Sequence, residues 1–189
     1  APTKFIENMQ PLLKWRVVDG MGYYFGLFNK RRTQSKHEIP DLLTEDATSP
    51  FDQGVGRSIW YTSRAEIGKA ELIIGDFSVE RKADLWRGIG IACAYIGGCT
   101  ERELGLIYQA AGDYQKQLVC GATLACRTRY FAEAHTEASN EVIEAWSNMN
   151  AEEAYQLSVE QEPSADSAEG DEYKDWIRRM ADAVKTRIA

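Results

Sequence analysis

Apolar side chains recur every three to four residues along most of the chain, which is the spacing of a helix that buries one face. After Thr100 they fall at Leu104, Ile107 and Tyr108. The strict alternation of a half-buried strand is nowhere sustained. The pattern predicts helices near residues 5–13, 14–28, 51–61, 64–75, 79–96, 101–111, 113–133, 136–147, 151–161 and 171–187.

Helix-start and helix-stop signals agree with this pattern. Ser63, Thr100 and Asn150 are each followed three positions later by Glu. This is the form of a capping box, in which two side chains satisfy free backbone N–H groups at a helix start. Glycine, which tolerates the backbone that ends a helix, stands at several expected ends. These are Gly75, Gly97, Gly98 and Gly112.

Small residues repeat with a fixed period. Gly-x-Gly occurs at 20–22, 54–56 and 88–90, and Gly-Ala-Thr follows at 121–123. The first glycines are 34, 34 and 33 residues apart, the length of a helix–turn–helix repeat. Glycine inside a helix costs about 1 kcal/mol relative to alanine, so we expect neighbouring helices to approach closely there. The predicted fold is an all-α, αα-helical repeat array with a tetratricopeptide-like period, although most of that consensus is missing.

Three segments follow from this organisation. Residues 1–159 form the predicted array, interrupted by a long loop at 29–50 that is either disordered or functional. Residues 160–171 form an acidic linker, since they are rich in Glu, Ser and Ala. Residues 172–189 form a C-terminal helix that folds back to cap the array.

Charge and composition limit the classes of partner and the cellular locations that we expect. The chain has 189 residues, a net charge of −7 and 44% hydrophobic residues. An acidic chain is a poor ligand for a phosphate backbone, so no nucleic-acid partner is expected. No transmembrane segment is expected, because no uninterrupted apolar run is long enough. We expect a cytoplasmic or membrane-peripheral protein, and a processed, exported form stays open because the chain starts at Ala1. The four cysteines form no Cys-x-x-Cys pair, which favours free thiols and leaves disulfides open.

The histidines give no metal-binding pattern. His37 and His135 are the only two, and neither belongs to a His-x-x-x-His or Glu-x-x-His sequence. We therefore predict no metal, no cofactor and no catalytic residue, and we lean against an enzyme.

A polar series accompanies the repeat. The residue before each first glycine is Asp19, then Gln53, then Arg87, and finally Cys120. In a regular array these positions lie along one line. The series serves either hydrogen bonding between helices or contact with a ligand or peptide. We place the candidate binding surface at Asp19, Gln53, Arg57, Asp84 and Arg87, with Trp60 and Trp86 as aromatic neighbours.

Several longer motifs occur in a fixed order. They are Asp19-Gly20-x-Gly22-Tyr23, Phe25-Gly26-x-Phe28, Asp52-Gln53-Gly54-x-Gly56-Arg57-Ser58-x-Trp60, Arg81-x-Ala83-Asp84-Leu85-Trp86-x-Gly88-x-Gly90, Tyr95-x-Gly97-Gly98, His135-Thr136 and Tyr173-x-x-Trp176. Together they resemble a bacterial enediyne-biosynthesis-associated protein family of unknown function. The resemblance implies that the chain corresponds to the C-terminal part of such a protein. It implies no catalytic residue, and the chain departs from the family's usual pattern at Arg87 and Cys120.

Two functions remain open at this point. The first is a non-catalytic helical-repeat interaction module or accessory subunit of a larger bacterial complex with a protein partner. The resemblance implies that this larger complex could be membrane-associated, since the family's gene neighbours include a membrane protein. The alternative is a small-molecule binder or accessory enzyme in enediyne or polyketide-type (polyunsaturated hydrocarbon) biosynthesis.

Overall fold

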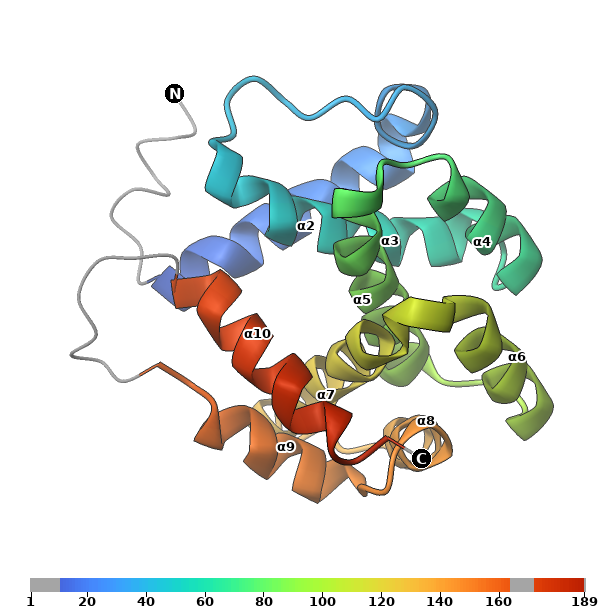
Figure 1. Ribbon diagram of the computed structural model, residues 1–189, viewed down its shortest axis with the longest axis vertical. Coiled ribbons are helices and arrows are strands. Elements are labelled where there is room, and N and C mark those ends of the chain that lie inside the picture. Colours follow the sequence, from blue (N-terminus) through green and yellow to red (C-terminus); the bar gives the residue numbers. More distant parts are fainter. Residues whose placement is uncertain (1–10, 164–171, 189) are drawn as a thin grey trace.

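The computed structural model describes residues 11–163 and 172–188 (Figure 1). Within these ranges the chain has nine α-helices and no strand, which confirms the all-α class. The α-helices are α2 (Pro11–Phe28), α3 (Thr48–Thr62), α4 (Ile67–Gly75), α5 (Val79–Ile96), α6 (Glu101–Ala111), α7 (Gln115–Phe131), α8 (Glu137–Trp146), α9 (Ala151–Glu160) and α10 (Glu172–Lys185). Short turns of helix are η1 (Arg31–Ser35), η2 (Glu45–Ala47) and η3 (Gly112–Tyr114). Most of the helix expected near 5–13 lies outside the described residues.

Two of the three expected capping boxes are confirmed. Thr100 and Asn150 each accept the backbone N–H of the Glu three residues on, and that Glu accepts the N–H of the cap. The capping box expected at Ser63 is wrong. Ser63 ends α3, and its hydroxyl donates to the Trp60 carbonyl over 2.9 Å. The physical reason is that Arg64 and Ala65 both adopt positive φ, so the chain reverses there before α4 begins at Ile67.

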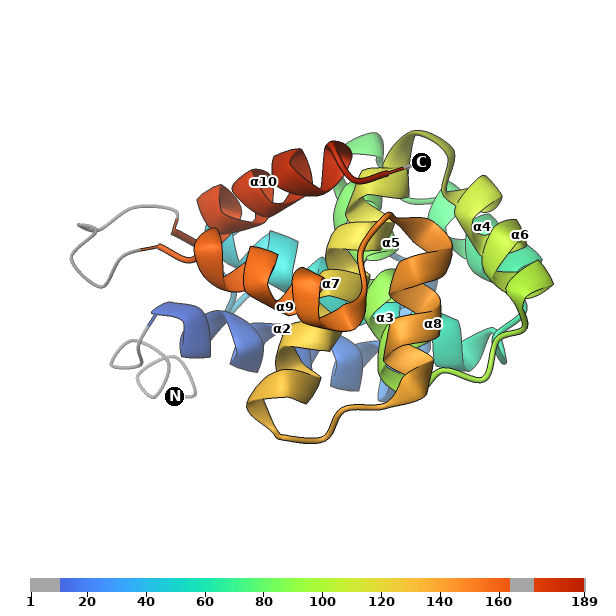
Figure 2. The same cartoon turned by 90° about the horizontal axis from the view of Figure 1, so that it is seen from below.

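The helices form two rows. An inner row consists of α2, α3, α5, α7 and α9, each packed on the next, and an outer row consists of α4, α6 and α8. The C-terminal helix α10 runs along one side of the inner row and packs on α7, α2 and α9 (Figures 1 and 2). It therefore covers a side of the row, whereas the sequence suggested that it caps one end.

Glycines allow the inner helices to touch backbone to backbone. A Cβ atom added to Gly54 would lie 1.9 Å from the Asp19 carbonyl oxygen. The same atom on Gly88 would lie 2.1 Å from the carbonyl oxygen of Gln53. The expected packing role of these glycines is thereby confirmed. The crossings of α2 with α3 and of α3 with α5 are equivalent, while a complete tetratricopeptide-like solenoid stays a prediction.

Residues 29–50, expected from the sequence to be a long loop that is either disordered or functional, pack against the array. The buried Gln34 donates its amide to the Gly26 carbonyl at 3.1 Å and to Ser58 Oγ at 3.2 Å. Further along, Arg81 donates to the His37 carbonyl at 2.7 Å while it pairs with the buried carboxylate of Asp52. These bonds satisfy buried polar groups, so they hold the segment on α2, α3 and α5.

The expected acidic linker falls mostly outside the described residues. Its first part continues from α9, and there Glu162 pairs with the buried Arg127 at 2.8 Å. Within the described ranges, none of the helices combines the length and apolar character needed to cross a membrane.

Candidate functional site

The polar series predicted from the repeat forms a chain of hydrogen bonds across three inner helices. Gln53 donates its amide to Asp19 Oδ1 at 3.0 Å. Arg87 Nε donates to the Oε1 of the same glutamine at 2.6 Å. Asp19 lies on α2, Gln53 on α3 and Arg87 on α5, so the equivalent positions of successive helices touch, as the period suggested.

Arg87 also makes contacts at the far end of this series of hydrogen bonds. Its NH2 group lies 2.5 Å from Asp84 Oδ1, one turn earlier on α5. Ser49, at the start of α3, donates its hydroxyl to the same carboxylate oxygen at 2.8 Å. The Arg87 side chain is buried and its charge is matched by Asp84. A buried, paired guanidinium of this kind holds neighbouring helices in register.

Tyr173 of α10 completes the network, and sequence reasoning did not assign it there. Its hydroxyl donates to Gln53 Oε1 at 2.7 Å. The sequence places Tyr173 in an apolar stripe, which indicates burial but not a partner. We call the connected set of Asp19, Ser49, Gln53, Arg57, Asp84, Arg87 and Tyr173 the polar network.

Arg57 is the least buried cation of the polar network. Its NH2 group pairs with Asp19 Oδ2 at 2.6 Å, and its guanidinium lies 4.8 Å from the ring centre of Tyr23. Arg57 Nε is buried and has no hydrogen-bond acceptor among the described residues.

Burial shapes the ionisation of the network. It raises the pKa of Asp19, and the nearby guanidinium of Arg57 and the amide of Gln53 oppose that rise. It also raises the pKa of the Tyr173 hydroxyl, so this group stays protonated and acts as a donor. For Arg87 burial is the largest single effect and lowers the pKa, but the charge and hydrogen bond of Asp84 together with the other neighbouring groups make the net pKa shift upward. Each guanidinium group of the network lies beside one carboxylate, Arg57 beside Asp19 and Arg87 beside Asp84.

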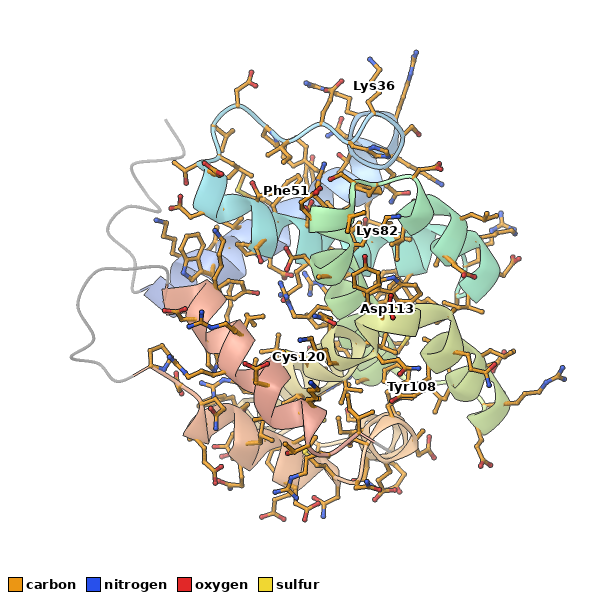
Figure 3. All side chains as sticks on the ribbon, viewed as in Figure 1. Lys36, Phe51, Lys82, Tyr108, Asp113 and Cys120 are labelled. Carbon is orange, nitrogen blue, oxygen red and sulfur yellow. The ribbon has the colours of Figure 1, made fainter. Side chains whose placement is uncertain are left out.

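Three of the residues singled out by sequence take no part in the polar network. Trp60 and Trp86 are buried in the apolar core, where large aromatic side chains contribute most by removing surface from water. Cys120, the fourth member of the series, lies inside the array (Figure 3), and burial raises the pKa of its thiol to about 11. The two tryptophans are thus core residues and do not line the pocket described next.

A pocket of about 270 Å³ adjoins the polar network between the inner row and α10. Asp19, Gln53 and Arg57 form its polar side. The remaining walls come from α2, α5, α7 and α10, and they include Trp15, Ile91, Leu124 and Trp176. We call this cavity the α10 pocket. The binding surface predicted from the sequence includes neither Trp15 nor Trp176, because their apolar spacing on a helix is typical of core residues.

The described residues contain no group of three or more His, Cys, Asp or Glu side chains arranged to hold a metal ion. The chemistry available at the polar network and the α10 pocket is therefore that of paired charges, amide and hydroxyl hydrogen bonds, and aromatic surfaces. Such groups position helices and bind ligands.

No curated protein and no solved structure matches the chain. A family match is present and spans residues 2–184. Because this covers nearly the whole sequence, the chain belongs to the family described as "Protein of unknown function (DUF1702)".

Proposed function

We propose that the protein is a non-catalytic accessory subunit of a larger bacterial complex, built as a helical-repeat array that docks a partner's helix on α2. The observation that carries this proposal is Gly20. Gly54, Gly88 and Gly121 would each meet the backbone of the preceding inner helix if they carried a Cβ atom, whereas Gly20 has nothing within 4 Å. One glycine of the series thus lacks its neighbouring helix.

The surface beside Gly20 toward the C-terminal end of α2 is aromatic and exposed, and on its other side Gly20 lines the α10 pocket. Tyr24 and Phe28, one and two turns further along α2, have exposed fractions of 55% and 71%. Their rings lie 4.9 Å apart and form a continuous aromatic surface with the bare backbone of Gly20. We call Gly20, Tyr24 and Phe28 the open α2 face. Exposed apolar surface of this kind marks interaction sites.

The repeated crossings define the occupant. At each crossing the second glycine of one helix faces a carbonyl of the next: Gly22 faces Phe51, Gly56 faces Leu85 and Gly90 faces Leu118. The carbonyl that corresponds to these on α2 is that of Val17, three residues before Gly20. A helix that repeats the crossing on the open α2 face therefore needs a glycine opposite Val17.

That helix comes from outside these 189 residues. Every Gly-x-Gly pair of the chain already has its second glycine against a neighbouring inner helix. Residues 1–10 contain no glycine. A second copy of the chain therefore cannot offer a free helix of this type, and the Gly-x-Gly helix that we propose for the open α2 face lies outside these 189 residues.

A peptide from the chain itself provides a probe. A stapled, fluorescently labelled peptide with the sequence of Thr48–Thr62 carries Gly54 and Gly56 on a helix, and it is titrated with the full chain by fluorescence anisotropy. We expect saturable binding that weakens about tenfold or more in the Gly20→Leu protein, since a leucine at the crossing keeps the two backbones apart. The Gly56→Leu peptide is the matched control and is expected to bind equally poorly. Binding that is absent, or that Gly20→Leu leaves unchanged, contradicts the proposal.

The α10 pocket favours a second candidate. Its aromatic walls suit a small molecule, which agrees with a small-molecule binder or accessory enzyme in enediyne or polyketide-type (polyunsaturated hydrocarbon) biosynthesis. Association with enediyne clusters rests on the sequence resemblance alone, and a ligand co-purifying with the chain would test this candidate by mass spectrometry.

A further inference from the structure

Two side chains that line the α10 pocket each carry a buried nitrogen donor without an acceptor among the described residues. Trp15 has an exposed fraction of 6%, and its indole N–H has no hydrogen-bond partner among the described residues. Arg57 Nε is also buried without a hydrogen-bond partner among the described residues, and both side chains line the pocket. Buried N–H groups are paired in the great majority of folded proteins, and each unpaired donor costs free energy. Two such donors beside one cavity indicate a missing acceptor.

The neighbouring acceptor is already occupied. Asp19 also lines the pocket, but its Oδ1 receives the Gln53 amide and its Oδ2 receives Arg57. Gln53 Oε1 likewise receives Arg87 and Tyr173. The polar side of the pocket therefore carries two donors without partners, while the acceptors of Asp19 and Gln53 beside them already receive hydrogen bonds, which favours a ligand that accepts hydrogen bonds.

Local charge selects an anionic acceptor. Arg57 faces the pocket, Arg16 lines it from the exposed side of α2, and the Lys14 ammonium lies 4.7 Å from the Trp15 ring centre. Asp19 is the single acidic side chain among the lining residues. A carboxylate can accept from an indole N–H and a guanidinium at once, and hydrogen bonds to charged groups are the stronger ones.

The rest of the cavity fits a flat apolar body. Ile91 and Leu124 form an aliphatic floor from α5 and α7. The aromatic side chains of the walls contact one another. The ring centres of Trp15 and Tyr173 lie 5.9 Å apart, and those of Tyr173 and Trp176 lie 6.3 Å apart. Aromatic walls prefer planar π-systems, which stack or meet them edge-on.

We propose that the α10 pocket binds a small carboxylate with a planar unsaturated or aromatic body, whose carboxylate accepts hydrogen bonds from Trp15 and Arg57. This inference gives the second candidate function its ligand class. The α10 pocket and the open α2 face share Gly20, but they are tested with different probes, so cinnamate binding and peptide binding can each fail alone.

The test uses trans-cinnamate as the probe and the full chain labelled with ¹⁵N. We expect saturable shifts of the Trp15 indole N–H signal, which the Trp15→Phe variant identifies by its loss. Cinnamyl alcohol keeps the body without the carboxylate, and acetate keeps the carboxylate without the body. Both are expected to bind at least about tenfold more weakly than cinnamate, because each lacks one half of the recognised chemistry.

Two conservative variants separate this site from general packing. Trp15→Phe keeps an aromatic ring and removes the N–H, and Arg57→Lys keeps the charge and removes Nε–H. Calorimetric titration should show about tenfold weaker cinnamate binding in each variant. Arg102→Lys, on the exposed side of α6, is the control and should bind as the unaltered chain does. Melting curves verify that the variants fold.

Three results would overturn the inference. The first is the absence of saturable binding up to about 1 mM, the weak end of specific affinity. The second is equal binding of cinnamate and cinnamyl alcohol, which would assign the pocket to uncharged apolar ligands. The third is unchanged cinnamate affinity in both folded variants, which would place the carboxylate elsewhere.

Discussion

The hydroxyl of Tyr173 lies 2.7 Å from Gln53 Oε1, and this one hydrogen bond joins residues 120 positions apart. It ties α10 to the centre of the inner row, where Gln53 already links Asp19 to Arg87. The C-terminal helix therefore belongs to the polar network and is held there by a directed contact as well as by its apolar face.

Removing that hydroxyl should loosen α10 without dismantling the network. We expect Tyr173→Phe to lower the free energy of unfolding by about 1 kcal/mol, the usual contribution of a neutral hydrogen bond. Gln53 Oε1 keeps its bond from Arg87, so the loss stays small. Urea unfolding measures the difference. Tyr24→Phe, which removes an exposed hydroxyl, is the matched control, and an equal loss in both variants would refute a specific role for Tyr173.

Arg87 should be far less tolerant. Arg87→Met keeps much of the side-chain volume but leaves the carboxylate of Asp84 without its guanidinium partner. Breaking one half of a buried ion pair costs about 3–5 kcal/mol. We therefore expect a marked fall in melting temperature, recovered in part by the double variant Arg87→Met with Asp84→Asn. A single variant as stable as the unaltered chain would show that the pair does not hold the helices.

The sequence predicted the array far better than the site. Helical spacing located the described helices to within a few residues, because periodicity and caps are local signals. The repeat also placed Asp19, Gln53 and Arg87 together, since equivalent positions of successive helices face one another. It could not pair Tyr173 with Gln53, because nothing local records a contact between distant segments. Trp60 and Trp86, expected as aromatic neighbours of the polar series, lie in the apolar core, since an aromatic beside a polar residue on a helix can face either way.

The glycines provide a test within one series. Gly88→Ala would place a Cβ atom 2.1 Å from the Gln53 carbonyl, so the helices must separate, and we expect a loss of about 1–3 kcal/mol or more. Gly20→Ala meets nothing within 4 Å and should stabilise the isolated chain by about 0.5–1 kcal/mol through the higher helix propensity of alanine. Thermal unfolding of both variants measures the contrast. Effects of the same sign would contradict the assignment of Gly20 to an unoccupied crossing.

Thiol reactivity should separate one cysteine from the other three. The half-buried Cys99 has its pKa lowered by a hydrogen bond from Cys93, whereas burial raises the pKa of Cys93, of Cys120 and of Cys126. The thiolate is the reactive form, and a lower pKa means that more of it is present at a given pH. At pH 7.5 we therefore expect iodoacetamide to modify Cys99 first, as peptide mass spectrometry can measure.

The pH profile gives this last prediction its sharpest form. The Cys99 rate should reach half of its plateau below pH 9.0, the ordinary pKa of a cysteine from which its own value is lowered. Cys93→Ser replaces the thiol that donates to Cys99 with a hydroxyl of similar size, and Cys93→Ala removes the donor. We expect the profile of Cys99 to move to higher pH in the alanine variant and less so in the serine variant. Modification of Cys120 at the same rate as Cys99 in the folded chain would contradict the buried position of α7 in the inner row.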